Sequence, residues 1–384
     1  MRKSLLFLAS AALVLASCNN DVKLDENVAP AGSNAQKEIS FSTNAHKAKR
    51  AAGSAEYNAV ESTAFPENYD MKVVAYSVPK KGTAGNYFGS ATADGGILFD
   101  YKFVGGAYGA GNAAFWGGNP AQYWPLAPVT LNFLAVTKGG SPTADVVSPQ
   151  FNANYASGVT VTLTGNTPQA ASTGLGQHDL MYAFGRDSVT QSGNTLAFPD
   201  QVAMTFNHAL AWVCFRVKAG NAASKAIAIK GIMLHGAYYS GTFQAAVNNY
   251  DTTSTAKPLS WVAANTKWTG VIGSRVDSIS SPNVAGDTLT SYVKINTESF
   301  TGIGDGILVV PTSEITSTES ITSFDIIYSL NGNDYTYNFV PTAKTYAKGM
   351  KYIYDITMTL HEIIIDASVD NWGDGGTESV AIPE

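Results

Sequence analysis

Short runs in which apolar and polar residues alternate recur along most of the chain. Ile39-Ser40-Phe41-Ser42-Thr43 is the first, and Gly-, Pro- and Asn-rich turns separate it from the others. Period-two alternation predicts β-strands, because successive side chains of a strand point to opposite faces. Further strands are expected at 72–78, 130–136, 159–163, 179–184, 202–217, 227–234, 241–245, 288–295, 306–310, 323–329, 335–339 and 351–360. Because the i, i+3, i+4, i+7 spacing of an amphipathic helix is missing, the pattern predicts an all-β fold.

The predicted strands fall into two blocks, which indicates two β-sandwich domains in tandem. Regular short strands between turn signals are typical of sandwiches, and 384 residues leave room for two ordinary domains. We place the boundary near Pro199, which gives an N-terminal sandwich at 37–199 and a C-terminal sandwich at 200–384. Residues 18–36 carry Asn, Asp, Pro, Gly and Ser without an aromatic residue, which is the composition of a linker.

The composition fits a surface protein made of strands and tight turns. Hydrophobic residues make up 45% of the chain and charged residues only 14%, against a usual charged share of about 25%. This balance argues against intrinsic disorder and long coiled coils. The formal charge is −6, and basic residues cluster only at Lys47, Lys49 and Arg50. The electrostatic footprint of a nucleic-acid partner is therefore missing.

The N-terminus has the anatomy of a secretory signal. Arg2 and Lys3 precede an apolar stretch too short to span a bilayer. Leu15-Ala16-Ser17-Cys18 then matches the bacterial lipobox, in which the cysteine is acylated and becomes the new N-terminus. We expect residues 1–17 to be a lipoprotein signal peptide and Cys18 to hold the chain at the membrane through its lipid. Cys214 is the other cysteine, so no intramolecular disulfide framework is expected.

Catalytic and metal-binding patterns fail when their spacing is checked. His361-Glu362 begins like a zinc-protease motif, but Ile365 stands where the second histidine is needed. Gly174-Leu175-Gly176 could open a phosphate loop, yet Asp179 replaces the third glycine. We therefore expect no enzyme, no catalytic residues, no cofactor and no metal.

The basic segment near residue 50 resembles an exposed site for a trypsin-like surface protease. A cut after Arg50, with Lys47 and Lys49 as alternatives, would release the lipid anchor together with the strand that contains Ile39 and Phe41. A sheet that loses a strand exposes an edge that can accept another chain.

The C-terminus carries a strand beyond the last expected sandwich strand. Ile363, Ile365, Ala367 and Val369 line one face at period two, and Trp372, Val380 and Ile382 follow. This pattern suits a donor-strand extension over about 361–384, and subunits joined in this way form an open filament. A trimmed linker and an ordinary last strand remain the alternative explanation for the two ends.

The chain also carries a set of loose motifs that together resemble the fimbrillin family, the type V pilins of Bacteroides-type bacteria. The first of these motifs are the lipobox, the strand at 39–42 and the basic segment that ends at Arg50. The further motifs are Trp116, Tyr123-Trp124-Pro125, Leu131-Asn132-Phe133-Leu134-Ala135, Asp179-Leu180-Met181-Tyr182-Ala183, Phe206-Asn207-His208-Ala209, Gly306-Ile307-Leu308-Val309-Val310-Pro311, Gly349-Met350-Lys351-Tyr352 and Trp372.

The resemblance implies two transthyretin-like β-sandwiches in tandem, export as an outer membrane lipoprotein precursor, cleavage by an arginine-specific surface protease and strand-exchange polymerisation into an extracellular fimbria. Cys18 would be the acylation site, Arg50 the residue before the cut bond, Ile39 and Phe41 the removed strand, and 363–382 the donor region. The implied partners are further copies of this chain and accessory anchor and tip pilins.

A stalk pilin that supports cell adhesion is thus the leading hypothesis, with an anchor or tip accessory pilin as a variant of it. The alternative from another class is a surface lipoprotein that binds glycan through the aromatic-rich segment at 99–124. The C-terminus discriminates between them, because a glycan binder has no use for a strand beyond its last sandwich strand.

Overall fold

The fold of the chain is known from a computed structural model. It describes residues 37–45, 70–77, 85–86, 99–104, 115–119, 122–138, 147–151, 158–166, 177–222, 227–245, 266–271, 279–280, 293–294, 299–303, 306–313, 315, 323–341, 346–371 and 380–381. Within these ranges the chain forms β-strands and connecting segments without an α-helix, which confirms the all-β prediction. No helix that could cross a membrane is found in this part of the chain.

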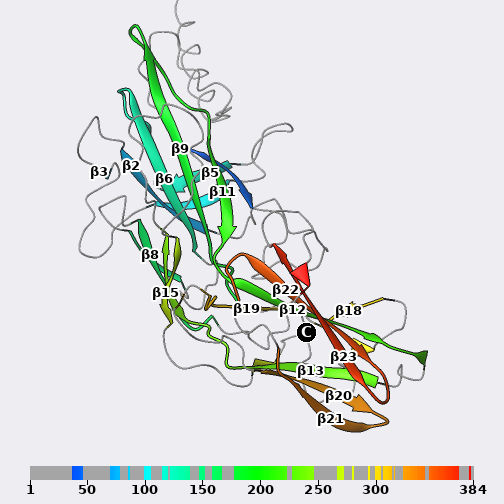
Figure 1. The fold of residues 1–384 in the computed structure, drawn as a ribbon. Coiled ribbons are helices and arrows are strands. Elements are labelled where there is room, and N and C mark those ends of the chain that lie inside the picture. The colour runs from blue at the N-terminus through cyan, green and yellow to red at the C-terminus, as the bar shows by residue number, and fades with distance from the viewer. Residues whose placement is uncertain are drawn as a thin grey trace, which may run out of the picture.

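The largest sheet occupies one half of the molecule, the upper half in Figure 1. Its nine strands are β1 (Phe41–Ala45), β2 (Asp70–Ser77), β3 (Gly85–Asn86), β4 (Phe99–Val104), β5 (Phe115–Asn119), β6 (Val129–Lys138), β9 (Met181–Ser192), β10 (Thr195–Ala197) and β11 (Val202–His208). The pairing closes on itself in the order β9-β11-β1-β5-β4-β2-β6-β9. We call this closed set of strands the ring. Because every strand of a ring has two neighbours, the removal of one strand opens the ring at one place.

A second sheet packs beside the ring. It consists of β7 (Val147–Phe151), β8 (Val159–Leu163), β14 (Gly241–Ala245) and β15 (Lys267–Val271), in the order β15-β14-β8-β7. The burial of β8 and β14 alternates strictly, as expected for strands with one covered face.

Two further sheets form the other half of the molecule. The third sheet contains β12 (Ala211–Ala219), β18 (Thr301–Gly302), β19 (Ile307–Val309), β22 (Met350–Met358), β23 (Ile363–Asn371) and β24 (Val380–Ala381). The fourth contains β13 (Ile227–His235), β16 (Ile279–Ser280), β17 (Val293–Lys294), β20 (Ser323–Leu330) and β21 (Asn333–Phe339). Aromatic side chains join the two sheets face to face. Phe324 of β20 contacts both Phe215 of β12 and Tyr354 of β22.

The apolar side chains gather in three clusters. One fills the inside of the ring and includes Phe41, Phe133 and Phe206. Another lies between the third and fourth sheets and includes Phe215 and Tyr354. The remaining cluster, which we call the joint core, draws on the ring, the second sheet and the third sheet: Leu134, Leu180, Val161, Phe243, Trp212 and Ile353 are among its members. Buried apolar surface is thus continuous between the two halves.

The predicted domain boundary near Pro199 differs from the observed change of sheet. β11 still belongs to the ring, and the chain passes to the third sheet at Ala209 and Leu210. The backbone N–H of Ala209 donates to Leu180 O (2.8 Å), and Leu210 O accepts from the N–H of Gly349 (2.8 Å). The run 202–217, predicted as continuous β structure, is therefore two strands in two sheets. β14 lies beyond the predicted boundary but pairs with β8 before it, so the division into two tandem domains stays a prediction.

Candidate functional site: the first and last strands

Strand β1 closes the ring, between β11 on one side and β5 on the other. It runs parallel to β11, with Phe41 opposite Val202 and Ala45 opposite Phe206. It runs antiparallel to β5, with Phe41 opposite Trp116. Figure 1 shows β1 in blue beside the green β11, although Phe41 and its partner Val202 lie far apart in the sequence.

The two apolar side chains at the start of this segment, Ile39 just before β1 and Phe41 in it, are fully buried inside the ring. Ile39 and Phe41 are both 0% exposed. The aromatic side chain of Phe41 packs edge-on against that of Phe133, with centroids 5.2 Å apart. Phe133 packs in the same way against Trp124, with centroids 5.8 Å apart. Full burial of a large apolar side chain contributes about 1.5–3 kcal/mol, so the first strand makes a substantial contribution to the ring.

Main-chain hydrogen bonds hold residues 37–41 on both sides. The N–H of Ile39 donates to Gln122 O (2.7 Å), and the N–H of Trp124 donates to Lys37 O (2.8 Å). On the other side, the N–H of Val202 donates to Ser40 O (2.9 Å). These bonds depend on backbone geometry rather than on side-chain identity, so another extended chain can make them in the place of residues 37–41. We call this place, between residues 122–124 and β11, the slot.

An ion pair marks the outer end of this slot. Lys37 Nζ lies 2.6 Å from Asp200 Oδ1. The hydrogen bond and the positive charge of Lys37 lower the pKa of the Asp200 carboxyl below its ordinary value. Because the Asp200 side chain is fully exposed, solvent screens this pair and its contribution to stability is small.

The last long strand, β23, lies in the third sheet of its own chain. It pairs antiparallel with β22 over nine positions, from Met350 opposite Asn371 to Met358 opposite Ile363. The predicted donor face, formed by Ile363, Ile365, Ala367 and Val369, is half-buried against the core between the third and fourth sheets. The next residue, Ile364, is 43% exposed on the other face. The four residues therefore share one face, which packs against the core of the same chain, and their role in a donor strand stays a prediction.

Several predicted site residues lie outside the described part of the chain. These are Cys18, Lys47, Lys49, Arg50, Trp372 and Ile382. Val380 is described only through its backbone, which pairs with Val369 in the short strand β24. The roles assigned to these residues stay predictions.

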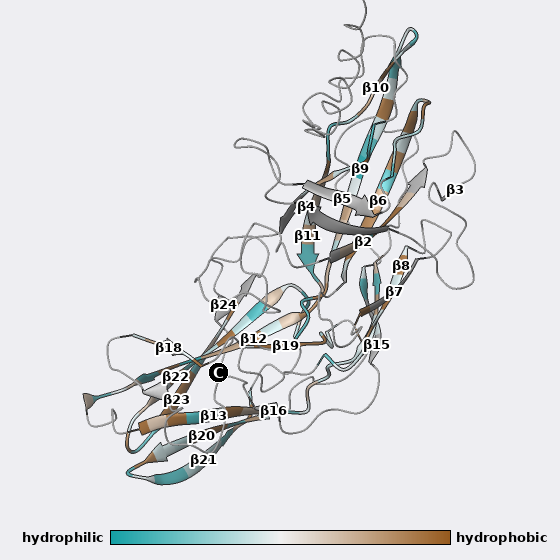
Figure 2. Cartoon of the chain, turned by 180° about the vertical axis from the view of Figure 1, so that it is seen from behind, coloured by the Kyte–Doolittle hydropathy of each residue, from teal (hydrophilic) through white to brown (hydrophobic). Residues whose placement is uncertain are grey.

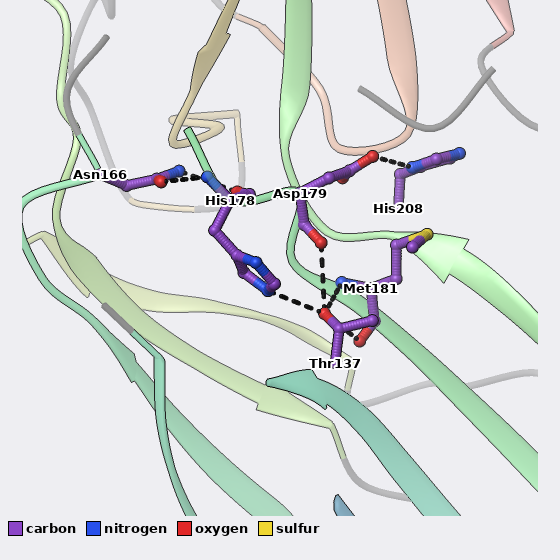
Figure 3. A network of polar contacts seen from close by, with 6 residues as sticks. All are labelled: Thr137, Asn166, His178, Asp179, Met181 and His208. Atoms are coloured by element: carbon purple, nitrogen blue, oxygen red, sulfur yellow. Dashed lines mark hydrogen bonds and ion pairs between the residues drawn. The ribbon is translucent and has the colours of Figure 1, made fainter. Parts of the chain in front are cut away.

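A buried polar network, which the sequence did not predict, lies where the ring meets the third sheet (Figure 3). His208 Nδ1 is 3.0 Å from Asp179 Oδ2, and both side chains are 0% exposed. His178 Nε2 is 3.1 Å from Thr137 Oγ1, and this hydroxyl oxygen accepts a hydrogen bond from the N–H of Met181. Because solvent and substrate have no access to the His208–Asp179 pair, this pair is structural rather than catalytic.

Gln177 extends this network to the third sheet. Its side-chain amide donates to Leu308 O (2.7 Å) and to Asn166 O (2.7 Å), and its Oε1 accepts from the N–H of Leu308 (2.8 Å). On the side of β19 that faces away from β12, Gln177 thus makes the two main-chain hydrogen bonds of Leu308 that a neighbouring strand would make. It holds β19 against the segment that precedes β9. Each such buried bond contributes about 0.5–1.5 kcal/mol and costs more than that if one partner is lost.

The protein is expected to lose stability in acid because of His178. Burial lowers the pKa of His178 from 6.5 to about 4, partly offset by the charge of Asp179 and the bond with Thr137. The unfolded chain therefore binds an extra proton between these two values, so stability is full above pH 6.5 and falls as the pH drops to about 4. At 1.36 kcal/mol per pKa unit the loss is about 3 kcal/mol. Urea unfolding at a series of pH values measures it.

His178→Gln and His361→Gln are the matched variants for this measurement. Gln at position 178 can still bond to Thr137 Oγ1 but does not titrate, so its stability should change less between pH 6.5 and 4. His361 is exposed, and its replacement should leave the acid loss unchanged. Equal acid sensitivity in all three proteins would contradict the assignment to His178.

The chain is similar to one known protein family and to several solved structures. The fimbrillin-like family matches residues 59–372. A putative cell adhesion protein from Bacteroides uniformis has 15% identity and a TM-score of 0.45, covering 87% of this chain and 99% of its own. A putative cell adhesion protein from Bacteroides ovatus has 13% identity and a TM-score of 0.47, covering 88% and 98%. The tip fimbrial protein Mfa3 from Porphyromonas gingivalis, truncated at its C-terminus, has 12% identity and a TM-score of 0.38, covering 88% and 100%. Among curated proteins no match is found.

Within the described part of the chain, the fold and the site define an all-β protein in which β1 and β23 lie in two separate sheets. The family match covers more than half of the residues, so the chain belongs to the fimbrillin-like family. Membership supports the role of a fimbrial subunit at the cell surface, with a structural rather than a catalytic task.

Proposed function

We propose that the chain is the stalk subunit of a cell-surface fimbria, exported as a lipoprotein acylated at Cys18, activated by a cut after Arg50 and polymerised by donor-strand exchange. The observation that carries the proposal is the place of β1. It closes the ring, its residue Phe41 and the preceding Ile39 are both 0% exposed, and the basic segment follows it directly. One cut there separates β1 from every other strand of the ring.

The vacated slot would offer the groove that a donated strand needs. Loss of β1 leaves β11 without its parallel partner and removes the contact of Phe41 with Phe133 from the floor of the slot. An incoming strand with apolar residues at every second position can restore both the hydrogen bonds and the burial. If about four apolar side chains enter, the gross gain is on the order of 6–12 kcal/mol before ordering costs.

The donor comes from residues 361–384. Separating β24 from its own sheet costs less free energy than separating β23, so the part beyond Asn371 is the more easily donated. β23 has nine register pairs with β22, whereas β24 has only two with β23. Each pair that breaks loses hydrogen bonds and side-chain contacts. Val380 and Ile382, which share one face at period two, therefore enter the groove of the next subunit, while β23 stays paired with β22 and connects the donor to its own sheet.

Limited proteolysis of the full chain tests this proposal. Trypsin at a low ratio should cut after Arg50 or a neighbouring lysine, and the product should then grow into ladders of oligomers that resist mild SDS. N-terminal mass and light scattering follow the two steps together. Wild-type protein that is cut at this site and stays monomeric would contradict the proposal.

The donor assignment predicts opposite results for two neighbouring changes. Val380→Asp combined with Ile382→Asp should abolish growth after the cut, because two carboxylates would enter an apolar groove without partners. Ala381→Asp, on the opposite face at period two, should grow within about threefold of the wild-type rate because exposed substitutions cost within about 0.5 kcal/mol. Equal growth of both variants would place the donor elsewhere. Urea unfolding of the uncut variants checks that their folds are intact.

The glycan-binding alternative gains no support from Trp124, whereas the neighbouring Tyr123 is 44% exposed. Trp124 is 1% exposed and packs edge-on against Phe133 inside the ring. A sugar platform needs an exposed ring face, so Trp124 is a core anchor rather than part of such a platform.

A further inference from the structure

Strand β21 forms the open edge of the fourth sheet. The sheet order ends at β21, and its described pairing is with β20 alone, from Phe324 opposite Phe339 to Leu330 opposite Asn333. Six of its seven residues are exposed. In Figures 1 and 2, which view the molecule from opposite sides, β21 is the outermost strand of its half.

The turn before β21 keeps this edge straight and in a fixed register. Asn331 (φ 53°) and Gly332 (φ 82°) both have positive φ, as a two-residue type I′ hairpin turn requires. The β20–β21 ladder then runs through seven consecutive positions. The edge is therefore regular over its full length.

β21 lacks the devices that usually protect an edge strand. Such strands are kept from pairing by Lys, Pro or a bulge, and the sequence Asn333-Asp334-Tyr335-Thr336-Tyr337-Asn338-Phe339 contains neither Lys nor Pro. Its single charge, on Asp334, is already paired with Lys230 Nζ at 2.5 Å. Every second residue of such a strand directs its N–H and C=O groups outward, where another strand can bind them.

The sequence of β21 is nearly symmetric about Thr336. If two copies of β21 pair antiparallel around this residue, Tyr335 of one copy stands opposite Tyr337 of the other, and Asp334 stands opposite Asn338. Aromatic pairs in such positions stabilise a sheet, and no like charges meet. Asn338 Nδ2 donates one hydrogen to Asp325 Oδ1 (2.7 Å). An amide nitrogen carries a second hydrogen, for which the Asp334 carboxylate of the second copy would be an acceptor.

The tyrosines give this edge an apolar surface to cover. Tyr335 and Tyr337 lie on one face of β21 and are 45% and 39% exposed. The ring of Tyr335 stacks on that of Tyr328, with centroids 5.6 Å apart and an interplanar angle of 23°. Two antiparallel copies would bring the tyrosine rows of both sheets into one continuous cluster.

We propose that β21 binds β21 of a second copy of this chain, antiparallel and centred on Thr336, so that the fourth sheets of the two copies join edge to edge. The interface is isologous, because the same residues contribute from both sides. It links copies side by side, and it stands whether or not the chain also polymerises through its termini.

Self-association of the uncut full chain tests the proposal. Sedimentation equilibrium should show a dimer that forms with rising concentration. Thr336→Lys should raise the dimer dissociation constant at least about tenfold, because two lysines would meet at the symmetry centre. Thr190→Lys is the matched control: Thr190 is an exposed strand threonine of the ring, and this variant should dimerise as wild type. A wild-type chain that stays monomeric, or equal dissociation constants for both variants, would overturn the proposal.

Disulfide trapping tests the register separately. Directly opposed antiparallel residues have Cα atoms about 4.5–5.5 Å apart, which a disulfide can bridge. In a Cys18→Ser background, Thr336→Cys should give a covalent dimer under mild oxidation, since the remaining Cys214 is buried. Asn333→Cys should not, because the two copies of residue 333 would lie about 20 Å apart. Cross-linking of Asn333→Cys in place of Thr336→Cys would overturn the proposed register.

Discussion

Phe41→Ala is expected to lower the free energy of unfolding of the uncut chain by about 3–5 kcal/mol. Phe41 is 0% exposed and meets Phe133 inside the ring with centroids 5.2 Å apart. Its replacement removes apolar burial and leaves a cavity that the surrounding strands can fill only in part. Urea unfolding near neutral pH, before any protease is added, measures the loss.

Once the chain has been cut, the Phe41→Ala variant is expected to have the same free energy of unfolding as the cut wild type. A cut after Arg50 followed by release of the first strand removes residue 41, so cut Phe41→Ala and cut wild type are the same polypeptide. Phe206→Ala is the control, because Phe206 is also 0% exposed in the ring core but lies on β11 and stays after the cut. A stability difference that persists between the two cut proteins would mean that the first strand is not released.

The sequence predicts strand positions well because alternation is a local property. The strict alternation of burial in β8 and β14 follows the residues, and the burial of Ile39 and Phe41 follows their period-two spacing. In each case the side-chain pattern alone decides which residues face the core. The same reasoning places the apolar residues of β23 on one face.

Strand partners are less predictable, because alternation says which face is buried and not which strand lies beside it. β1 pairs in parallel with β11, far along the chain, and nothing near Phe41 indicates this. The run 202–217 stays apolar through Ala209 and Leu210, so the change of sheet there leaves no local mark. The turn-like residue Pro199 is the nearest local signal, so the predicted boundary and the change of sheet differ by about ten residues, and the division into domains stays a prediction.

The buried polar network escapes prediction for a related reason. Gln177, His178 and Asp179 are three consecutive polar residues at the start of the strand expected at 179–184, and polar residues are mostly exposed. In the structure all three are at most 3% exposed, because Leu308, Thr137 and His208 supply partners from distant parts of the chain. Only the tertiary structure offers these partners, so the cost of burying the polar groups could not be judged beforehand.

Gly306→Ala is expected to destabilise the protein by about 2–6 kcal/mol, from backbone strain and overpacking together. Gly306 has φ +77°, which L side chains rarely adopt, and an added Cβ would lie 2.4 Å from Trp212 Nε1, 2.6 Å from Val213 O and 2.8 Å from Cys214 Sγ. One of these atoms belongs to the backbone of β12, so relief requires movement of β12 or β19. Thermal and urea unfolding measure the effect.

Gly193→Ala separates the two causes, because Gly193 has φ +58° but no heavy atom within 4 Å of the added Cβ. Gly193→Ala should therefore lower the free energy of unfolding only by the backbone strain of a positive φ, about 1–2 kcal/mol. If Gly306→Ala loses no more than Gly193→Ala, the contact of β19 with β12 must be looser than these distances indicate. A larger loss for Gly306→Ala means that the joint core, with Trp212 and Leu308 on either side of that contact, tolerates no added volume.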